Sequence, residues 1–315
     1  MEINQPRSCP VCECAESSPF LTKSDLILVR CEVCSMVYSL EVPVQYATGE
    51  FYDKGGPSFY LSKPKVESDY SAVRYKRELQ LFRRFCKGGD VLDVGCSTGG
   101  FLFNLKRTFC GEYTVLGTDV VSAALTYAEG HGVRVVRGEF LNHDFGDARF
   151  DAVTLWAVLE HLVDPAKTLL KVNSILKPGG LCFILVPNLG SIAVRMLGAR
   201  YRYFLQEHLN YFDSNTLRQI ACKYFECLHL GTTHFNPIVI FQDLLNRSLV
   251  SKEGRAQLLE RTTGYKQSRA LFPLRGIYWL CERVLQMFCL SDNLVFVGRS
   301  FQQSPPPPRF NSRHP

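Results

Sequence analysis

Long apolar segments are missing from this 315-residue sequence. It contains no uncharged run of about 18 or more apolar residues, so no membrane-spanning helix is indicated. The first ten residues lack a basic stretch followed by an apolar core, which argues against a secretory signal. We therefore expect a cytoplasmic protein.

A strong excess of charge of one sign is also lacking. The 36 basic and 30 acidic residues give a formal net charge of +6, spread along the chain. This excess is weak evidence for an anionic partner, because a solvated surface explains it equally well. The apolar fraction of 46% is ordinary for a globular protein and is sufficient for a sizeable core.

Cysteine, in contrast, is abundant, with 13 residues. Nine stand singly in apolar or motif contexts, where a reduced buried thiol is the usual state. The other four form two C-x2-C pairs separated by 18 residues, namely Cys9 with Cys12 and Cys31 with Cys34. This spacing is typical of four-thiolate zinc sites and predicts a structural Zn²⁺ ion. Cys14 could replace Cys12 as a ligand.

From Asp90 onward, short β-rich runs alternate with helical patterns, as in a parallel sheet flanked by helices. The pattern predicts an α/β fold with a Rossmann-like seven-stranded sheet. Its strands are expected near residues 91–94, 114–118, 133–136, 151–155, 181–186, 227–230 and 293–297. Its helices are expected near residues 101–109, 122–130 and 165–176.

The domain boundaries follow from these patterns. A zinc ribbon is expected over residues 1–40, followed by a connector or helical cap over 41–85. The α/β domain should extend over residues 86–303, with a helical insertion at about 236–290. The proline-rich segment 304–315 is expected to be disordered.

A glycine-rich turn, Asp93-Val94-Gly95-Cys96-Ser97-Thr98-Gly99, joins the first strand of this sheet to its helix. Glycines there let the backbone pass close to a ligand, and the helix start supplies free N–H groups. Asp119 ends the next strand 26 residues after Asp93, where a carboxylate can bind both hydroxyls of a ribose. A nicotinamide-binding loop would read G-x-G-x-x-G and face a pyrophosphate. The acid at position 93 repels phosphate but suits a ligand that carries an ammonium and a sulfonium group, which favours S-adenosylmethionine.

Residues 90–188 resemble the core of the class I S-adenosylmethionine-dependent methyltransferases, especially the small-molecule methyltransferase family. The glycine-rich turn matches the family's first motif, residues 150–153 with 159–165 match the fourth, and residues 176–180 with 187–188 match the turn and fifth strand. The resemblance implies a methyltransferase whose cofactor, S-adenosyl-L-methionine, is bound by Asp93, Gly95, Cys96, Gly99, Asp119, Glu139 and Phe140.

Two histidines are candidates for the catalytic base. The sulfonium methyl group is already activated, so the protein mainly aligns the acceptor and removes its proton, for which histidine is the usual residue. His161 follows the fourth strand on the face where open α/β sheets bind ligands. His208 lies in a segment that resembles the family's H-x-x-x-F element, which usually lines the acceptor pocket. Either residue could instead have only a packing role.

A catalytic magnesium ion is not expected. Some related methyltransferases hold a divalent metal beside the reacting oxygen with the sequence E-x-x-E-H at the fourth motif. In this chain the first position of that sequence is Ala157, so the first ligand is absent, although Glu160 and His161 are present.

The sequence thus predicts methyl transfer to a small-molecule or sugar-containing (glycan) acceptor, at oxygen rather than at carbon or nitrogen. The alternative is an RNA or DNA methyltransferase that uses the ribbon to bind nucleic acid. The fourth motif lacks the N/D-P-P-Y/F sequence of many such enzymes, so nucleic acid is the less favoured partner. A helix near 271–290 could pack on the sheet, lie on a membrane surface or form a dimer contact, and the oligomeric state stays open.

Overall fold

The structure is a computed structural model that describes residues 6–23, 25–47, 49–55, 57–245 and 272–301. The proline-rich segment 304–315 and residues 246–271 of the expected helical insertion lie outside the described residues. In the part that is described, none of the helices combines the length and apolar character needed to cross a bilayer.

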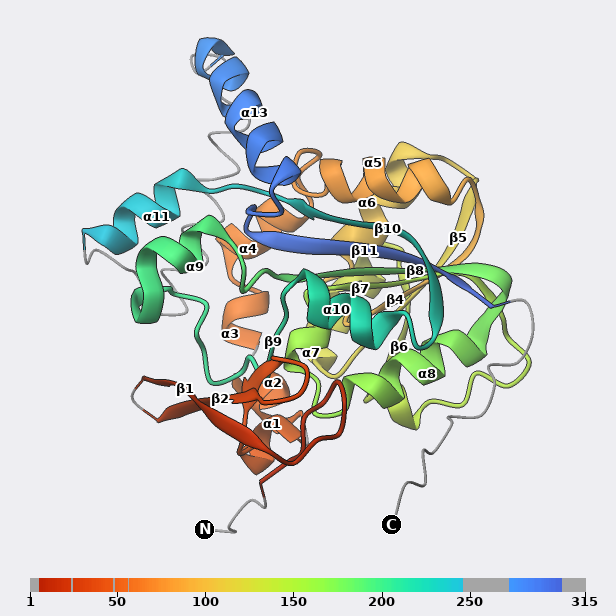
Figure 1. Ribbon diagram of the computed structural model, residues 1–315. Helices are drawn as coiled ribbons and strands as arrows, with labels where there is room; N and C mark the ends of the chain where they lie inside the picture. The colour runs from red at the N-terminus through yellow and green to blue at the C-terminus, as the bar shows by residue number, and fades with distance from the viewer. Residues whose placement is uncertain (1–5, 24, 48, 56, 246–271, 302–315) are drawn as a thin grey trace, which may run out of the picture.

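A seven-stranded sheet forms the centre of the molecule, in the order β10-β11-β8-β7-β4-β5-β6 (Figure 1). Five neighbouring strands are parallel, and β11 runs antiparallel between β8 and β10. The bounds are β4 (Gly89–Val94), β5 (Tyr113–Asp119), β6 (Arg134–Arg137), β7 (Phe150–Trp156), β8 (Leu176–Pro187), β10 (Phe225–Thr233) and β11 (Asn293–Ser300). The predicted Rossmann-like seven-stranded sheet is confirmed.

Helices cover both faces of this sheet because its strands carry apolar side chains on both sides. One face packs against three helices, α5 (Lys76–Phe85), α6 (Gly100–Thr108) and α7 (Ser122–Gly130). The other face packs against α8 (Pro165–Ile175) and α10 (Ser214–Ala221). In β8 the alternation is direct, since Phe183 faces the first group while Cys182 and Ile184 face the second.

The cysteine-rich N-terminus forms a second, four-stranded sheet in the order β1-β2-β3-β9 (Figure 1). Its strands are β1 (Ser17–Lys23), β2 (Leu26–Cys31), β3 (Val37–Ser39) and β9 (Asn210–Tyr211). The last strand comes from the α/β domain, in which Asn210 pairs with Tyr38 and Tyr211 with Val37. The ribbon is therefore hydrogen-bonded directly to the larger domain.

Short helices lie between the ribbon and α5, and further short helices and 3-10 turns follow later in the chain, in the loops of the α/β domain. They are α1 (Val44–Ala47), α2 (Glu50–Gly55), α3 (Pro57–Tyr60), α4 (Lys63–Asp69), α9 (Ile192–Leu197) and α11 (Pro237–Leu244), together with the 3-10 turns η1 (Phe140–Asn142), η2 (Leu159–His161) and η3 (Gly198–Arg200).

The helix expected near 271–290 is α13 (Phe272–Met287), which projects from the body at the top of Figure 1. Glu282 and Leu285 are buried, but Trp279, Leu280 and Met287 are exposed. The helix thus packs along only part of its surface.

Candidate active site

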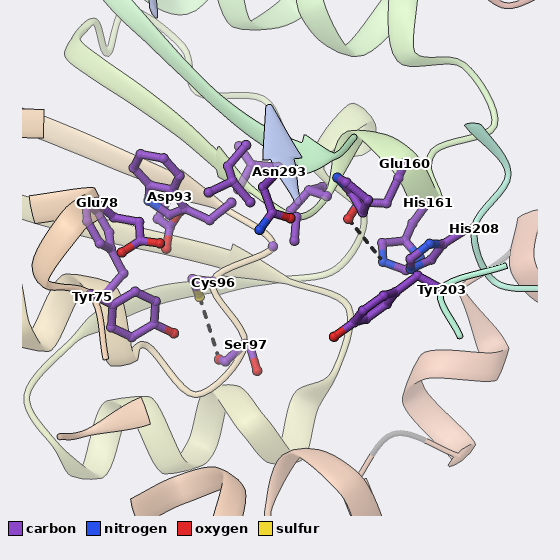
Figure 2. A pocket seen from close by; sticks show the side chains of 18 of the residues that line it. Tyr75, Glu78, Asp93, Cys96, Ser97, Glu160, His161, Tyr203, His208 and Asn293 are labelled. Carbon is purple, nitrogen blue, oxygen red and sulfur yellow. Dashed lines mark hydrogen bonds and ion pairs between the residues drawn. The ribbon is translucent and has the colours of Figure 1, made fainter. Parts of the chain in front are cut away.

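A large cavity of about 1460 Å³ opens beside the carboxyl ends of β4, β5 and β7. Ligands bind at this edge in open α/β sheets because the loops that leave the strands diverge there. Figure 2 shows acidic and aromatic side chains, among them Asp93 and Glu78, at one end of the cavity. Glu160, His161 and His208 lie at the other end.

The glycine-rich turn borders the first end of the cavity in a left-handed backbone conformation. Gly95 has φ +70°, Ser97 has φ +52° and Gly99 has φ +75°. A Cβ atom on Gly95 would lie 2.5 Å from a methyl group of Val158, so this position requires glycine. Gly99, which was predicted to bind the cofactor, is not among the residues that line the cavity. Its Cβ would lie 2.9 Å from the Cβ of Ala128, so glycine there serves the packing of the turn against α7.

Asp119 ends β5 with its carboxylate beside the turn. It accepts hydrogen bonds from the backbone N–H groups of Ser97, at 2.7 Å, and Val121, at 2.9 Å. Burial raises the pKa of Asp119, although these hydrogen bonds act in the opposite direction. Each carboxylate oxygen keeps further acceptor capacity at the edge of the cavity.

Asp93 lies on the neighbouring strand and is 3% exposed. Its Oδ1 atom accepts a hydrogen bond of 2.6 Å from the hydroxyl group of Thr154. Burial raises the pKa of Asp93 to about 7, and the negative charge of Asp119 adds to the increase. A cationic ligand at this end would favour the ionised form of both carboxyl groups.

The structure adds Arg74 and Glu78, which sequence analysis missed. Both line the same end of the cavity, and Arg74 Nε and Glu78 Oε2 are buried without a hydrogen-bond partner. Burial acts to raise the pKa of Glu78, but His234, at 2.7 Å from Oε1, and Arg74 outweigh it and lower the pKa to about 2. No glycine or motif spacing marks these residues. The only available signal was their position just ahead of the first strand of the α/β domain.

The other predicted cofactor residues also line the cavity. They are Cys96 in the turn, and Glu139 and Phe140 at the start of η1. Phe140 is buried, and Glu139 accepts a hydrogen bond from the side chain of Asn142 at 3.0 Å.

His161 belongs to η2, directly after β7, and its ring orientation is set by hydrogen bonds. Its Nδ1 atom lies 2.8 Å from the carbonyl oxygen of Glu207 and 2.9 Å from the hydroxyl oxygen of Tyr52. A carbonyl oxygen can only accept, so Nδ1 carries the proton of the neutral ring. The lone pair is therefore on Nε2, the nitrogen on the side of Glu160.

His208 lies next to His161, with ring centroids 4.7 Å apart and planes at 83°. Glu160 completes the group, with Oε1 at 4.0 Å from His161 Nε2. The carboxyl group of Glu160 is 1% exposed, and burial raises its pKa to about 8. Glu160, His161 and His208 each offer one ligand atom, and these atoms lie within 4.8 Å of one another, so the group could hold a metal ion.

The four predicted zinc ligands come together at the N-terminus. The Sγ atoms of Cys9 and Cys34 are 3.4 Å apart, as are those of Cys12 and Cys31, and all four lie within 4.8 Å of one another. These distances exclude disulfides, whose sulfur atoms are about 2.05 Å apart. A tetrahedral zinc site with Zn–S bonds of about 2.3 Å would separate the sulfurs by about 3.8 Å, so the cluster fits such an ion. Cys14 does not belong to this group, and its sulfur accepts a hydrogen bond from the backbone N–H of Glu16.

Arg7 connects the ribbon to the histidine end of the cavity. Its guanidinium group donates to the carbonyl oxygens of Ser39 and Val163, at 2.8 and 3.0 Å, and to that of Leu209. It also donates to the side-chain oxygen of Asn210 at 3.0 Å. The Arg7 side chain therefore joins β3, β9 and the loop after η2.

A second set of bonds fixes β9 to η2. The backbone N–H of Leu209 donates to the carbonyl oxygen of Glu160 at 2.8 Å. The side-chain amide of Asn210 donates to the carbonyl oxygens of Leu159 and Leu162, at 3.0 and 2.7 Å. His208 immediately precedes this strand, so the ribbon holds His208 against η2.

Comparison with known proteins shows similarity to methyltransferases. Residues 69–228 match a family model described as a methyltransferase domain. The ubiquinone biosynthesis O-methyltransferase of Dinoroseobacter shibae is 34% identical over 166 residues, which cover 48% of this chain and 65% of that protein. The demethylmenaquinone methyltransferase of Listeria monocytogenes is 30% identical over 136 residues, or 41% and 57% of the two chains. The chain thus spans less than two thirds of the length of either relative.

Among solved structures, the chain is similar to phosphoethanolamine N-methyltransferase 2 of Haemonchus contortus in complex with S-adenosyl-L-methionine. The TM-score is 0.52 at 16% identity, and the match covers 91% of this chain and 71% of that one. At this identity the similarity concerns the fold alone.

Proposed function

Because the chain belongs to the family of methyltransferase domains, we propose that it transfers the methyl group of S-adenosyl-L-methionine to an oxygen of a small-molecule or sugar-containing acceptor. One observation carries the proposal. Two carboxyl groups, Asp93, which is buried, and Asp119, which is half-buried, end adjacent parallel strands and face one cavity beside a left-handed glycine turn. Such a site suits a cationic nucleoside. Its charge disfavours a pyrophosphate.

We assign different residues of this chain to different parts of the cofactor. Asp119 would accept hydrogen bonds from the ribose hydroxyls with the acceptor capacity that Ser97 and Val121 leave. The backbone at Gly95 and Cys96 would hold the nucleoside, and Glu139 and Phe140 would hold the adenine. Arg74 supplies a half-buried cation and Glu78 a buried anion, which suit the carboxylate and ammonium groups of the methionine part.

At the other end of the cavity, the acceptor meets the activated methyl group that S-adenosyl-L-methionine supplies. The acceptor oxygen forms a bond to the methyl carbon as the carbon–sulfur bond breaks, and that electron pair stays on sulfur. The hydroxyl proton must leave the acceptor. We assign its removal to His161 and His208, which line this end of the cavity, with the lone pair of His161 on Nε2.

For the ribbon we propose a structural Zn²⁺ ion bound by Cys9, Cys12, Cys31 and Cys34. A site with four thiolates has no open coordination position, so its role is to stabilise the fold. The hydrogen bonds of Arg7 and the pairing of β3 with β9 transmit that stability to His208. The ribbon thereby supports the acceptor end of the site.

Isothermal titration calorimetry on the zinc-loaded protein tests the proposal. S-adenosyl-L-methionine and S-adenosylhomocysteine should both bind, and Asp119→Ala should weaken binding by about 100-fold or more, because two hydrogen bonds to a charged group contribute about 1.5–3 kcal/mol each. Asp147→Ala makes the same change at an exposed position outside the cavity and should leave the affinity unchanged. Absence of heat with both ligands, or full affinity in Asp119→Ala, would refute the proposed function.

A further inference from the structure

We propose that Glu160, His161 and His208 bind a divalent transition-metal ion at the acceptor end of the cavity. The three side chains come from two segments of the chain, η2 and the loop before β9 (Figure 2). Their ligand atoms lie within 4.8 Å of one another, with Glu160 Oε1 at 4.0 Å from His161 Nε2. Small side-chain rotations would bring these atoms to the metal–ligand distances of about 2.0–2.2 Å that imidazole and carboxylate prefer.

A second observation points to a ligand at this place. Glu160 is 1% exposed, and its Oε2 atom is buried without a hydrogen-bond partner. Buried carboxylate oxygens in folded proteins almost always have a partner, because leaving one without any costs about 1–3 kcal/mol or more. An ion between Glu160 and the two histidines would satisfy this group.

The hydrogen bonds around His161 are those of a metal ligand. A histidine that binds a metal through one ring nitrogen usually donates its other N–H to a carbonyl or carboxylate oxygen, which fixes the ring. Here Nδ1–H donates to the carbonyl oxygen of Glu207, so the lone pair of Nε2 is directed to the side of Glu160. His208 is held by β9, whose position depends on the ribbon.

The donor set selects the kind of ion. Magnesium prefers oxygen ligands, whereas two imidazoles and one carboxylate suit Zn²⁺, Mn²⁺ or Fe²⁺. Three protein ligands leave at least one coordination position open toward the cavity. The sequence expectation of no catalytic magnesium ion rested on Ala157, and in this proposal His208, 51 residues further along the chain, supplies the third ligand instead.

The role of the ion, unlike its binding, rests on the proposed function. When bound, the ion would stabilise the anion that an acceptor hydroxyl becomes when its proton passes to water, and the electron pair of the broken O–H bond would form the new bond to the methyl carbon. In that case His161 and His208 would hold the ion and would not themselves accept the proton.

Metal binding is measured on the full chain with the ribbon already loaded with zinc. Mn²⁺ is the probe, because it prefers nitrogen and oxygen ligands to thiolates and its free form is quantified by electron paramagnetic resonance. One Mn²⁺ site per chain is expected. Glu160→Gln, which keeps the side-chain shape, and His208→Ala should each weaken binding by about tenfold or more. His229→Ala is the matched control, because His229 lies on β10 outside the cavity lining and should leave binding unchanged.

Two results would overturn the metal site. One is the absence of any Mn²⁺ binding by the zinc-loaded wild-type protein at millimolar concentration, together with a zinc content of one per chain when zinc is in excess. The other is Mn²⁺ binding that is the same in Glu160→Gln, His208→Ala and wild type. S-adenosylhomocysteine is titrated into every variant as a test of folding and of the proposed function. If His208→Ala does not bind S-adenosylhomocysteine, the comparison of Mn²⁺ binding between Glu160→Gln and the wild type decides whether the metal site exists. If the wild type does not bind S-adenosylhomocysteine, the methyltransferase proposal is refuted, whereas the Mn²⁺ result still holds.

Discussion

Replacing Thr154 with valine is expected to move the pH at which the affinity for S-adenosyl-L-methionine changes. The hydroxyl of Thr154 donates to Asp93 Oδ1 at 2.6 Å, and both side chains are buried. Burial raises the pKa of Asp93 to about 7, and this hydrogen bond limits the increase because it stabilises the carboxylate. Valine has nearly the same shape but cannot donate, so the pKa of Asp93 should rise further.

The size of the shift follows from the lost bond. A hydrogen bond to a charged group contributes about 1.5–3 kcal/mol, and one pKa unit corresponds to 1.36 kcal/mol, so an upward shift of about one to two units is expected. A cationic ligand binds better beside ionised Asp93. Affinity should therefore rise with pH through about 7 in the wild type and through a higher pH in Thr154→Val.

The unliganded protein should show the opposite dependence. The folded pKa of Asp93 lies above its ordinary value of 3.8. The protonated group then contributes stability that is fully present below about pH 3.8 and is lost as the pH rises through about 7. The contribution of Asp93 to the free energy of unfolding of the unliganded protein should thus be smaller at pH 7 than at pH 5. Added S-adenosyl-L-methionine should offset the loss.

Calorimetric titrations between about pH 5.5 and 8.5 measure the effect on affinity. The amino group of the ligand also titrates near pH 8, but equally for every variant, so it cancels in the comparison. Thr232→Val is the matched control, because its buried hydroxyl has no hydrogen-bond partner and lies on β10, outside the cavity lining. A wild-type affinity independent of pH, or the same midpoint in Thr154→Val and Thr232→Val, would contradict this account of Asp93.

Three further changes test other parts of the site. Gly95→Ala should weaken S-adenosylhomocysteine binding by tenfold or more in calorimetry, since the new Cβ would lie 2.5 Å from Val158 at φ +70°; unchanged affinity would show that the turn adapts. Cys12→Ser should lower the zinc content and the melting temperature and should slow methyl transfer. The affinity for S-adenosylhomocysteine should stay within about twofold of the wild type, because the ribbon supports only the histidine end of the cavity. A normal rate of methyl transfer without zinc would argue against that coupling. His161→Ala should keep cofactor binding but reduce turnover by about 100-fold, and unchanged turnover would exclude a role in proton removal.

Much of the α/β domain was predictable from local patterns. Each strand of the parallel sheet is a short β-rich run beside a helical segment, and burial on both faces makes such runs continuous and easy to place. The first turn was also predictable, because the left-handed backbone at Gly95 requires glycine. The cysteine spacing placed the four sulfur atoms in one cluster for a similar reason, since two tight turns leave few other arrangements.

The histidine end of the site was only partly predictable. His161 and His208 were singled out one at a time, but their contact, 47 residues apart in the sequence, depends on where β9 lies. That strand has only two residues, too few for any periodicity, and it forms because the ribbon edge offers β3 as a partner. Glu78 on α5 and Arg74 just before this helix belong to no motif and so were not singled out, and the packing of Gly99 against α7 could not be read from the sequence.

The sequence by itself determined the α/β class, the two acids at the ends of adjacent strands and the paired cysteines, because each depends on residues a few positions apart or on a repeated strand–helix unit. Only the tertiary structure decided that the ribbon shares a sheet with the larger domain and that Glu160, His161 and His208 meet. Such contacts depend on the free energy of packing between segments that are distant in the sequence, and a local sequence pattern carries no information about it.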